Sequence, residues 1–185
     1  MSLTIIDTPL AGLKIVERHP RGDDRGFLAR LFDGADLRAC GWDAAIEQVN
    51  HTYTAQAGTI RGMHYQLPPH AEIKLVSCIR GAVWDVAVDI RQGSPTFLQW
   101  HAERLSADNG RALLIPRGFA HGFQTLTDDV EMLYCHSAPY APQAEAALHY
   151  QDARLGIAWP LPLTQVSPRD QRHPRLDTDF LGVAL

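Results

Sequence analysis

The sequence contains few cysteines and no long apolar run. Its 185 residues include only Cys40, Cys78 and Cys135, whose odd number and wide spacing argue against a disulfide framework and against a zinc knuckle. No apolar stretch is long enough to span a bilayer, and the first ten residues lack the basic start and the apolar run of a signal peptide. We therefore expect a soluble cytoplasmic protein with buried thiols and no membrane partner.

The sequence also lacks an excess of positive charge and has few lysines. The formal net charge is −4, and among the 17 basic residues only Lys14 and Lys74 are lysines. A chain without a basic excess carries no electrostatic footprint for nucleic acid, so we expect no such partner. Lys74 lies in the apolar run KLVSCI, where a buried ammonium is costly unless a negative charge lies or develops nearby. This position indicates function, and a strand-edge lysine that reaches solvent is the alternative.

Helical periodicity is almost absent, and short apolar segments separated by turn signals follow one another along the chain. Residues 74–79 and 82–90 flank Arg80-Gly81, a pattern typical of a hairpin. Other strands are expected at 13–18, 27–32, 46–54, 97–105, 111–115, 120–126, 130–137 and 146–150, with short helices within 34–42 and around 168–172. The length suits one domain over residues 1–185. Eight or more short strands predict an all-β jelly roll or a related barrel.

The segment GTIRGMHYQ, residues 58–66, places polar side chains where a buried strand should be apolar. In a regular strand, alternate side chains face opposite sides, so Arg61 and His64 would point apart. The two can share a site only if the strand contains a bulge or kink. Gly62, which lies between them, is where such an irregularity could form.

A second polar cluster, GRALLIPRGFAHGF at residues 110–123, has the glycine, proline and histidine spacing of the second half-motif of the cupin barrels. The first half-motif is met by Gly58 and His64, but Gln66 stands where its second histidine is expected. A cupin metal centre usually takes about three histidines and a carboxylate, and here only His64, His121 and Glu72 remain as candidates. We therefore expect no metal.

Nine segments in one order cover the chain from about residue 7 to about residue 175: DDRGF (23–27), QVNHTYT (48–54), GTIRGMHYQ (58–66), KLV (74–76), VWDVAVDIRQGSPTF (83–97), IPRGFAHGF (115–123), Tyr134, YAPQAE (140–145) and LGIAWP (155–160). Together they resemble the dTDP-4-dehydrorhamnose 3,5-epimerase family. The resemblance implies a metal-free cupin jelly roll without a cofactor that works as a homodimer with strand exchange. It also implies an isomerase that inverts C3, C5 or both of a nucleotide-linked 4-keto-6-deoxyhexose, in dTDP-rhamnose, lipopolysaccharide or antibiotic sugar biosynthesis.

Inversion next to a ketone needs a base, stabilisation of the enolate oxygen, and an acid on the opposite face. By resemblance His64 is the base, with Asp170 behind it to fix the tautomer and stabilise the imidazolium. Lys74 is the enolate stabiliser and Tyr134 the acid. A core histidine and an ordinary core tyrosine are the structural alternatives for His64 and Tyr134.

The resemblance also assigns the binding of the sugar nucleotide. Guanidinium groups fit a diphosphate in a bidentate manner, and an aromatic ring can stack on the base. The residues implied are Arg25, Phe27, Arg30, Gln48, Asn50, Arg61, His121, Tyr140 and Glu145.

Arg30 departs from the family, which usually carries glutamate at this position in a region that meets the base. A carboxylate could accept the N3–H of thymine, whereas a guanidinium only donates. We therefore expect either a nucleotide other than dTDP or recognition of thymine through other residues. The alternative is that Arg30 points to solvent or pairs with a nearby acid such as Asp33.

Two other functional classes stay open. A metal-dependent cupin oxygenase or isomerase would bind iron, manganese or zinc. A non-catalytic sugar-nucleotide-binding cupin would keep the barrel but lose the base or the acid, and here both are present. Within the epimerase hypothesis, the same base and acid could act at C3, at C5 or at both centres.

Overall fold

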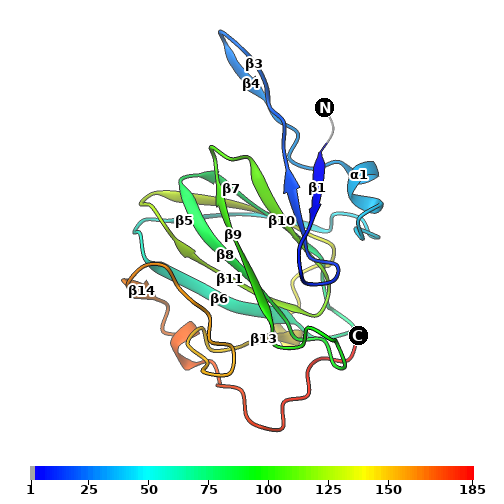
Figure 1. The fold of residues 1–185 in the computed structure, drawn as a ribbon, viewed down its shortest axis with the longest axis vertical. Helices are drawn as coiled ribbons and strands as arrows, with labels where there is room; N and C mark the ends of the chain where they lie inside the picture. Colours follow the sequence, from blue (N-terminus) through cyan, green and yellow to red (C-terminus); the bar gives the residue numbers. More distant parts are fainter. Residues whose placement is uncertain (1–2) are drawn as a thin grey trace.

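The chain forms two six-stranded β-sheets that pack face to face (Figure 1). The computed structural model describes residues 3–185. The first sheet has the order β1-β2-β10-β7-β12-β5, formed by Thr4–Asp7, Lys14–Glu17, Arg111–Ile115, Lys74–Arg80, Val130–His136 and Gln48–Thr54. The second has the order β13-β6-β11-β8-β9, formed by Glu145–Ala147, Thr59–Gln66, Phe119–Thr125, Ala82–Asp89 and Trp100–Ser106, with β14 (Gln165–Val166) paired to β6. The expected all-β jelly-roll class is confirmed.

The main core lies between the two sheets. Side chains such as Val76 and Leu113 from the first sheet meet Val83 and Phe123 from the second, and all four are almost completely buried. Because successive side chains of a strand alternate between its faces, each sheet also has an outer face that needs cover. A helix segment covers one of these faces, and the C-terminal segment covers the other.

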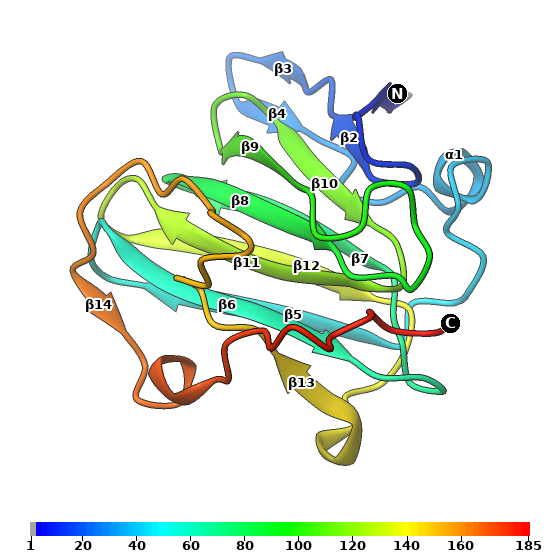
Figure 2. The ribbon, with the colours of Figure 1, turned by 60° about the horizontal axis from the view of Figure 1, so that its bottom comes forward.

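Helix α1 (Gly34–Arg38) covers the outer face of the first sheet, where Leu37 packs in a buried cluster with Trp42 and Leu75. Asp33 caps this helix, since its carboxylate accepts hydrogen bonds from the first-turn backbone N–H groups. On the second sheet, the C-terminal segment runs across the outer face (Figure 2), and Leu148, Leu155 and Val183 lie in one buried cluster with strand residues. Two short 3₁₀ helices, η1 (Pro142–Ala144) and η2 (Asp170–Arg172), complete the fold.

The predicted hairpin across Arg80-Gly81 is wrong. Strand β7 pairs with β10 and β12 in the first sheet, whereas β8 pairs with β11 and β9 in the second. Gly81 has a φ of +72°, and a Cβ there would lie 2.5 Å from the Thr127 hydroxyl, so this tight crossing between the sheets requires glycine. The sequence signal for a sharp turn was correct, but a turn alone does not determine which strands pair.

Other predicted elements differ mainly at their ends. The strand expected at 27–32 is confined to β4 (Gly26–Leu28), because the chain then leads into the cap of α1. Three strands were not predicted: β1, β14 and β3 (Arg21–Asp23), which forms with β4 a hairpin that extends away from the sheets in Figure 1. Among residues 3–185, no helix is long and apolar enough to cross a membrane. The three cysteines are free thiols; Cys78 and Cys135 are buried, as expected, whereas Cys40 is only partly buried.

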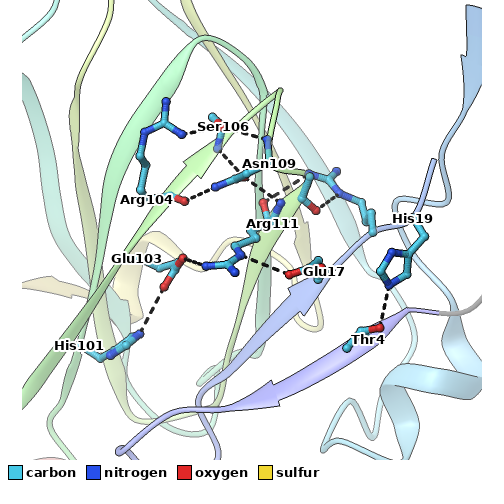
Figure 3. A network of polar contacts seen from close by, with 11 residues as sticks. Thr4, Glu17, His19, His101, Glu103, Arg104, Ser106, Asn109 and Arg111 are labelled. Carbon is cyan, nitrogen blue, oxygen red and sulfur yellow. Dashed lines mark hydrogen bonds and ion pairs between the residues drawn. The ribbon is translucent and has the colours of Figure 1, made fainter.

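A polar network ties the two sheets together at one end of the barrel (Figure 3). Arg111 on β10 donates to Glu17 on β2 at 3.4 Å and to Glu103 on β9, in the other sheet, at 2.7 Å. The adjoining turn is held by Asn109, whose Oδ1 accepts from two backbone N–H groups and whose Nδ2 donates to the carbonyl of Arg104 at 2.7 Å. One side chain therefore satisfies three backbone groups of the β9–β10 turn.

We predict that Asn109→Ala lowers the free energy of unfolding by about 1–2 kcal/mol, because it leaves backbone groups of this turn without partners. Urea denaturation followed by tryptophan fluorescence measures the loss. Asp108→Ala, at the neighbouring exposed position, is the control and should stay within about 0.5 kcal/mol of wild type. Equal stability of the two variants would show that the Asn109 contacts contribute nothing.

Candidate active site

A bulge in β6 decides which side chains enter the site. His64 pairs with His121 and Arg61 with Phe123, so three steps along β6 match two steps along β11. Gly62 lies in this bulge with a φ of +137°, and a Cβ there would come within 2.5 Å of the Cα of Gly122. The extra residue reverses the alternation, so Arg61 and His64 line the same cavity. The irregularity expected at Gly62 is confirmed.

The cavity has a volume of about 640 Å³ and is bounded by both sheets and by the segment before η2. Ten of the residues predicted for the site line it: Gln48, Asn50, Arg61, His64, Lys74, His121, Tyr134, Tyr140, Glu145 and Asp170. Side chains alternate along β5, which explains why Gln48 and Asn50 enter the cavity. These two and Thr52 are less exposed than the residues between them, Val49, His51 and Tyr53.

His64 and Asp170 form a hydrogen-bonded pair. The Nε2 atom of His64 lies 2.8 Å from Oδ1 of Asp170, whose side chain is 5% exposed. Burial alone would raise the pKa of Asp170, but the hydrogen bond and charge of His64, with the backbone N–H of Gly62, lower it below its ordinary value. His173 also contacts this carboxylate, with Nε2 at 3.2 Å from the same oxygen. Asp170 is therefore an anion held beside the imidazole of His64.

Tyr134 approaches the cavity from the opposite sheet, on β12. Its ring lies edge-on to that of His121 and stacks on that of His136, at centroid distances of 6.1 and 6.0 Å. Burial, followed by the negative charge of Asp85, raises the pKa of Tyr134 far above its ordinary value. Tyr134 is therefore a neutral phenol over the whole physiological pH range.

Lys74 is the first residue of β7, and its side chain is 10% exposed. Its ammonium donates to Oε1 of Glu72 at 3.2 Å and to the backbone carbonyl of His64 at 3.5 Å. The alternative of a lysine that reaches solvent is thus wrong. The ammonium lies beside the backbone of the proposed base, where it faces the cavity.

His121 is held by a second buried carboxylate. Its Nε2 lies 3.0 Å from both oxygens of Asp85, and neither side chain is more than 6% exposed. Gln66, where a second cupin histidine was expected, instead accepts from the backbone N–H of Ala141 at 2.7 Å and donates to the carbonyl of His70 at 3.0 Å. His121 is thus held in one orientation at the cavity wall, and the contacts of Gln66 fix the backbone around the cavity.

The outer end of the cavity is polar and accessible. Tyr140 is 53% exposed, and its hydroxyl donates to Glu145 at 2.6 Å. Glu145 also pairs with Arg169. Arg61 lies toward the other end of β5, where its guanidinium donates to the Thr54 hydroxyl at 3.0 Å. An aromatic ring with one arginine nearby, and a second arginine farther along the cavity wall, suits a ligand that has both a planar ring and negative charge.

Three predicted binding residues, Arg25, Phe27 and Arg30, do not line this cavity. Arg25 and Phe27 lie on the β3–β4 hairpin, where Arg25 forms a bidentate contact with Asp23 and Phe27 is 77% exposed. Arg30 donates to Asp33 at 2.7 Å, as the alternative from the sequence foresaw. The β3–β4 hairpin extends away from the barrel (Figure 1), so the role of these residues in substrate binding stays a prediction.

The candidate metal ligands from the sequence do not come together. Within residues 3–185, the group of potential ligand atoms that lie within 4.8 Å of one another is His64, Asp170 and His173, without His121 or Glu72. Glu72 is instead held by Lys74 and by His136, whose Nδ1 lies 2.7 Å from Oε2 of Glu72.

Sequence reasoning missed His136 and Asp85 and considered Glu72 only as a metal ligand. His136 could have been found, because it lies two residues after Tyr134 on the same strand and therefore on the same face. Asp85 interrupts the apolar strand AVWDVAVD, which is also a visible signal. Glu72 precedes its strand, so no periodicity predicts where its side chain points.

Comparison with known proteins gives one consistent result. The family model described as dTDP-4-dehydrorhamnose 3,5-epimerase matches residues 7–178. The chain belongs to the dTDP-4-dehydrorhamnose 3,5-epimerase family. It is 42% identical to the Sinorhizobium fredii protein of that name over 168 residues, which cover 90% of this chain and 86% of the relative.

Solved structures agree with this family assignment. The RmlC epimerase of Legionella pneumophila, in complex with dTDP-4-keto-L-rhamnose, is 40% identical with a TM-score of 0.91, over 98% of both chains. ChmJ, a 3'-monoepimerase from Streptomyces bikiniensis in complex with dTDP-quinovose, is 35% identical with a TM-score of 0.85, over 92% of this chain and 86% of its own. Similarity therefore extends to epimerases that differ in the centres they invert.

We predict that Gly62→Ala lowers the free energy of unfolding by about 3 kcal/mol or more, because a methyl group would collide with β11 in addition to adopting an unfavourable φ. Gly93→Ala is the matched control, since Gly93 also has a positive φ but no atom within 4 Å of an added Cβ. The control should lose only about 1 kcal/mol. Equal losses in urea denaturation would contradict the close contact at Gly62.

Proposed function

We propose that this protein is an epimerase that inverts C3, C5 or both centres of a nucleotide-linked 4-keto-6-deoxyhexose, in the biosynthesis of a deoxysugar such as dTDP-rhamnose. One observation carries the proposal: a histidine backed by a carboxylate, a neutral phenol on the facing sheet and a buried ammonium line one cavity. These are the base, the acid and the oxyanion partner that proton exchange beside a ketone requires.

The hydrogen bond to Asp170 supports one order of proton transfers. With Nε2–H of His64 donating to the carboxylate, Nδ1 carries the lone pair that removes the proton from the carbon next to the ketone. The bonding electrons move into the ketone, and the ammonium of Lys74 stabilises the resulting enolate oxygen. Tyr134 then donates its hydroxyl proton to the opposite face of that carbon. The imidazolium returns its proton to solvent, and the phenolate takes one back.

The outer end of the cavity is suited to the nucleotide. The exposed ring of Tyr140 offers a stacking surface. Arg169 near it, and Arg61 farther along the cavity at the Thr54 end of β5, supply guanidinium groups that can bind a diphosphate. Gln48 and Asn50 add amide groups that can both donate and accept. The relative crystallised with dTDP-4-keto-L-rhamnose supports dTDP as the nucleotide carrier here.

We also propose that the protein acts as a homodimer in which the β3–β4 hairpin packs against the partner chain. The hairpin extends from the barrel, and Phe27 and Leu28 expose 77% and 65% of their surface, which is unfavourable for an isolated chain. In such a dimer, Arg25 and Phe27 reach a substrate bound in the partner's cavity, and they regain the binding role that the sequence predicted.

We predict that His64→Ala abolishes deuterium uptake at the carbons next to the ketone, because every deprotonation is assigned to this base.

Tyr134→Phe should keep deuterium uptake but lose inversion, since His64 can return a proton to the original face. NMR of a nucleotide 4-ketosugar incubated in heavy water measures both. His51→Ala, on the outer face of β5, is the control and should match wild type. Deuterium uptake by His64→Ala would assign the base elsewhere.

We predict that Arg30→Glu leaves the order of affinities for dTDP, UDP, CDP and GDP unchanged, with dTDP bound best, because Arg30 pairs with Asp33 outside the cavity. Isothermal titration of both proteins with each diphosphate measures this order. If wild type prefers another nucleotide and Arg30→Glu restores dTDP, then Arg30 reads the base, as its departure from the family first suggested.

A further inference from the structure

A continuous series of hydrogen bonds runs along the wall of the cavity formed by β5 and β12. At its outer end, the backbone N–H of Tyr140 donates to Oε1 of Gln48 at 3.0 Å. The amide of Gln48 donates to Oδ1 of Asn50 at 2.9 Å, and Nδ2 of Asn50 lies 3.4 Å from Nε2 of His136. The outer end of the cavity is thereby connected to His136.

The inner half of the series ends at Lys74. Nδ1 of His136 lies 2.7 Å from Oε2 of Glu72, and the other oxygen of Glu72 accepts from the ammonium of Lys74 at 3.2 Å. Since an amide nitrogen can only donate, Nε2 of His136 accepts from Asn50, and the proton lies on Nδ1, which donates to Glu72. Every hydrogen bond in the series therefore has a defined donor and a defined acceptor.

Glu72 is the centre of this arrangement. The side chains of Glu72, Lys74 and His136 are 9%, 10% and 13% exposed. A buried carboxylate is stable only when both of its oxygens have strong donors, and here one oxygen takes an ammonium and the other an imidazole N–H. Burial raises the pKa of Glu72, but His136 and Lys74 together lower it below its ordinary value, so the carboxylate stays ionised.

Resting on the proposed function, we propose that Glu72 and His136 are positioning residues that fix the ammonium of Lys74 at the place where the enolate oxygen forms. Within residues 3–185, the ammonium of Lys74 has one carboxylate partner, Glu72, and its other acceptor is the carbonyl of His64 at 3.5 Å. Glu72 alone could rotate, but the hydrogen bond from His136 holds its second oxygen. Because the ammonium is aligned before substrate arrives, stabilisation of the enolate requires little reorganisation.

The chain offers a matched control on the same two strands. His51 on β5 and Glu131 on β12 form another histidine–glutamate pair, with Nε2 and Oε2 at 2.8 Å, but His51 is exposed and the pair lies outside the cavity. Glu131→Gln therefore removes a similar carboxylate from the same pair of strands without touching the site.

The first experiment needs no substrate. Because Lys14 and Lys74 are the only lysines, protein labelled with ¹⁵N-lysine gives two side-chain Nζ signals. We expect Glu72→Gln to shift the Lys74 signal and to speed hydrogen exchange of its ammonium by about tenfold or more, because a charge-assisted hydrogen bond is lost. The Lys14 signal should not change, and Glu131→Gln should change neither signal. An unchanged Lys74 signal in Glu72→Gln overturns the proposal.

The second experiment uses the epimerase reaction. Glu72→Gln should lower kcat by about tenfold or more with KM changed less than about threefold, because the alignment matters to developing charge rather than to substrate affinity. His136→Gln, which keeps an N–H donor for Glu72, should lose less activity than His136→Leu, and this rescue separates positioning from a structural role. If His136→Gln and His136→Leu lose equal activity while both fold, His136 does not position Glu72.

The two experiments can reject the proposed function and the positioning role independently of each other. If wild type does not act on any nucleotide 4-ketosugar while the Lys74 signal responds to Glu72→Gln, the proposed function is wrong and the positioning of the ammonium stands. If wild type is active and kcat of Glu72→Gln is unchanged, the positioning role is wrong. Should Glu72→Gln not fold, His136→Gln and His136→Leu supply the same two measurements with the carboxylate retained.

Discussion

The close contact of β6 with β11 is the constraint on which the site depends. Neither Gly62 nor Gly122 can carry a side chain, because an added Cβ would meet backbone of the other strand within 2.5 and 2.7 Å. The contact accommodates one extra residue in β6, which turns Arg61 and His64 to the same side. The backbone N–H of Gly62 also lies 3.4 Å from Oδ2 of Asp170. One local distortion thus places the candidate base and helps to orient its carboxylate.

The cavity is rich in ionisable side chains, and they occur in pairs rather than singly. Asp170 meets His64, Glu72 meets Lys74, and Asp85 meets His121. A lone buried charge would cost more than most single contacts in a protein contribute, whereas a paired charge that is fully hydrogen-bonded is tolerable. Such pairs rarely add stability compared with apolar packing, so their concentration around one cavity favours a role in chemistry.

Sequence reasoning reached the parts of the fold that depend on local pattern. The short apolar segments separated by turn signals predict an all-β fold, and Gly62 in GTIRGMHYQ marks where an irregular strand could form. Sequence reasoning failed where the structure depends on which strands, distant in the sequence, pair with each other. A sharp turn at Gly81 fits a hairpin and a crossing between sheets equally well, and only the partners of β7 and β8 distinguish them. For the same reason, the pattern around Arg25 and Phe27 could not reveal that their hairpin leaves the barrel.

The two histidines of the cupin half-motifs show how a barrel of this kind can be adapted to proton transfer. His64 and His121, the positions at which the two half-motifs would supply metal ligands, lie directly opposite each other on β6 and β11. Here each imidazole nitrogen Nε2 faces its own carboxylate instead, Asp170 for His64 and Asp85 for His121. A carboxylate that accepts the N–H of an imidazole makes the other ring nitrogen more basic and stabilises the imidazolium that forms when it takes a proton. The same strand positions therefore suit a general base. The third position of the half-motifs holds Gln66, whose side chain bonds to backbone groups and so fixes the loops around the cavity.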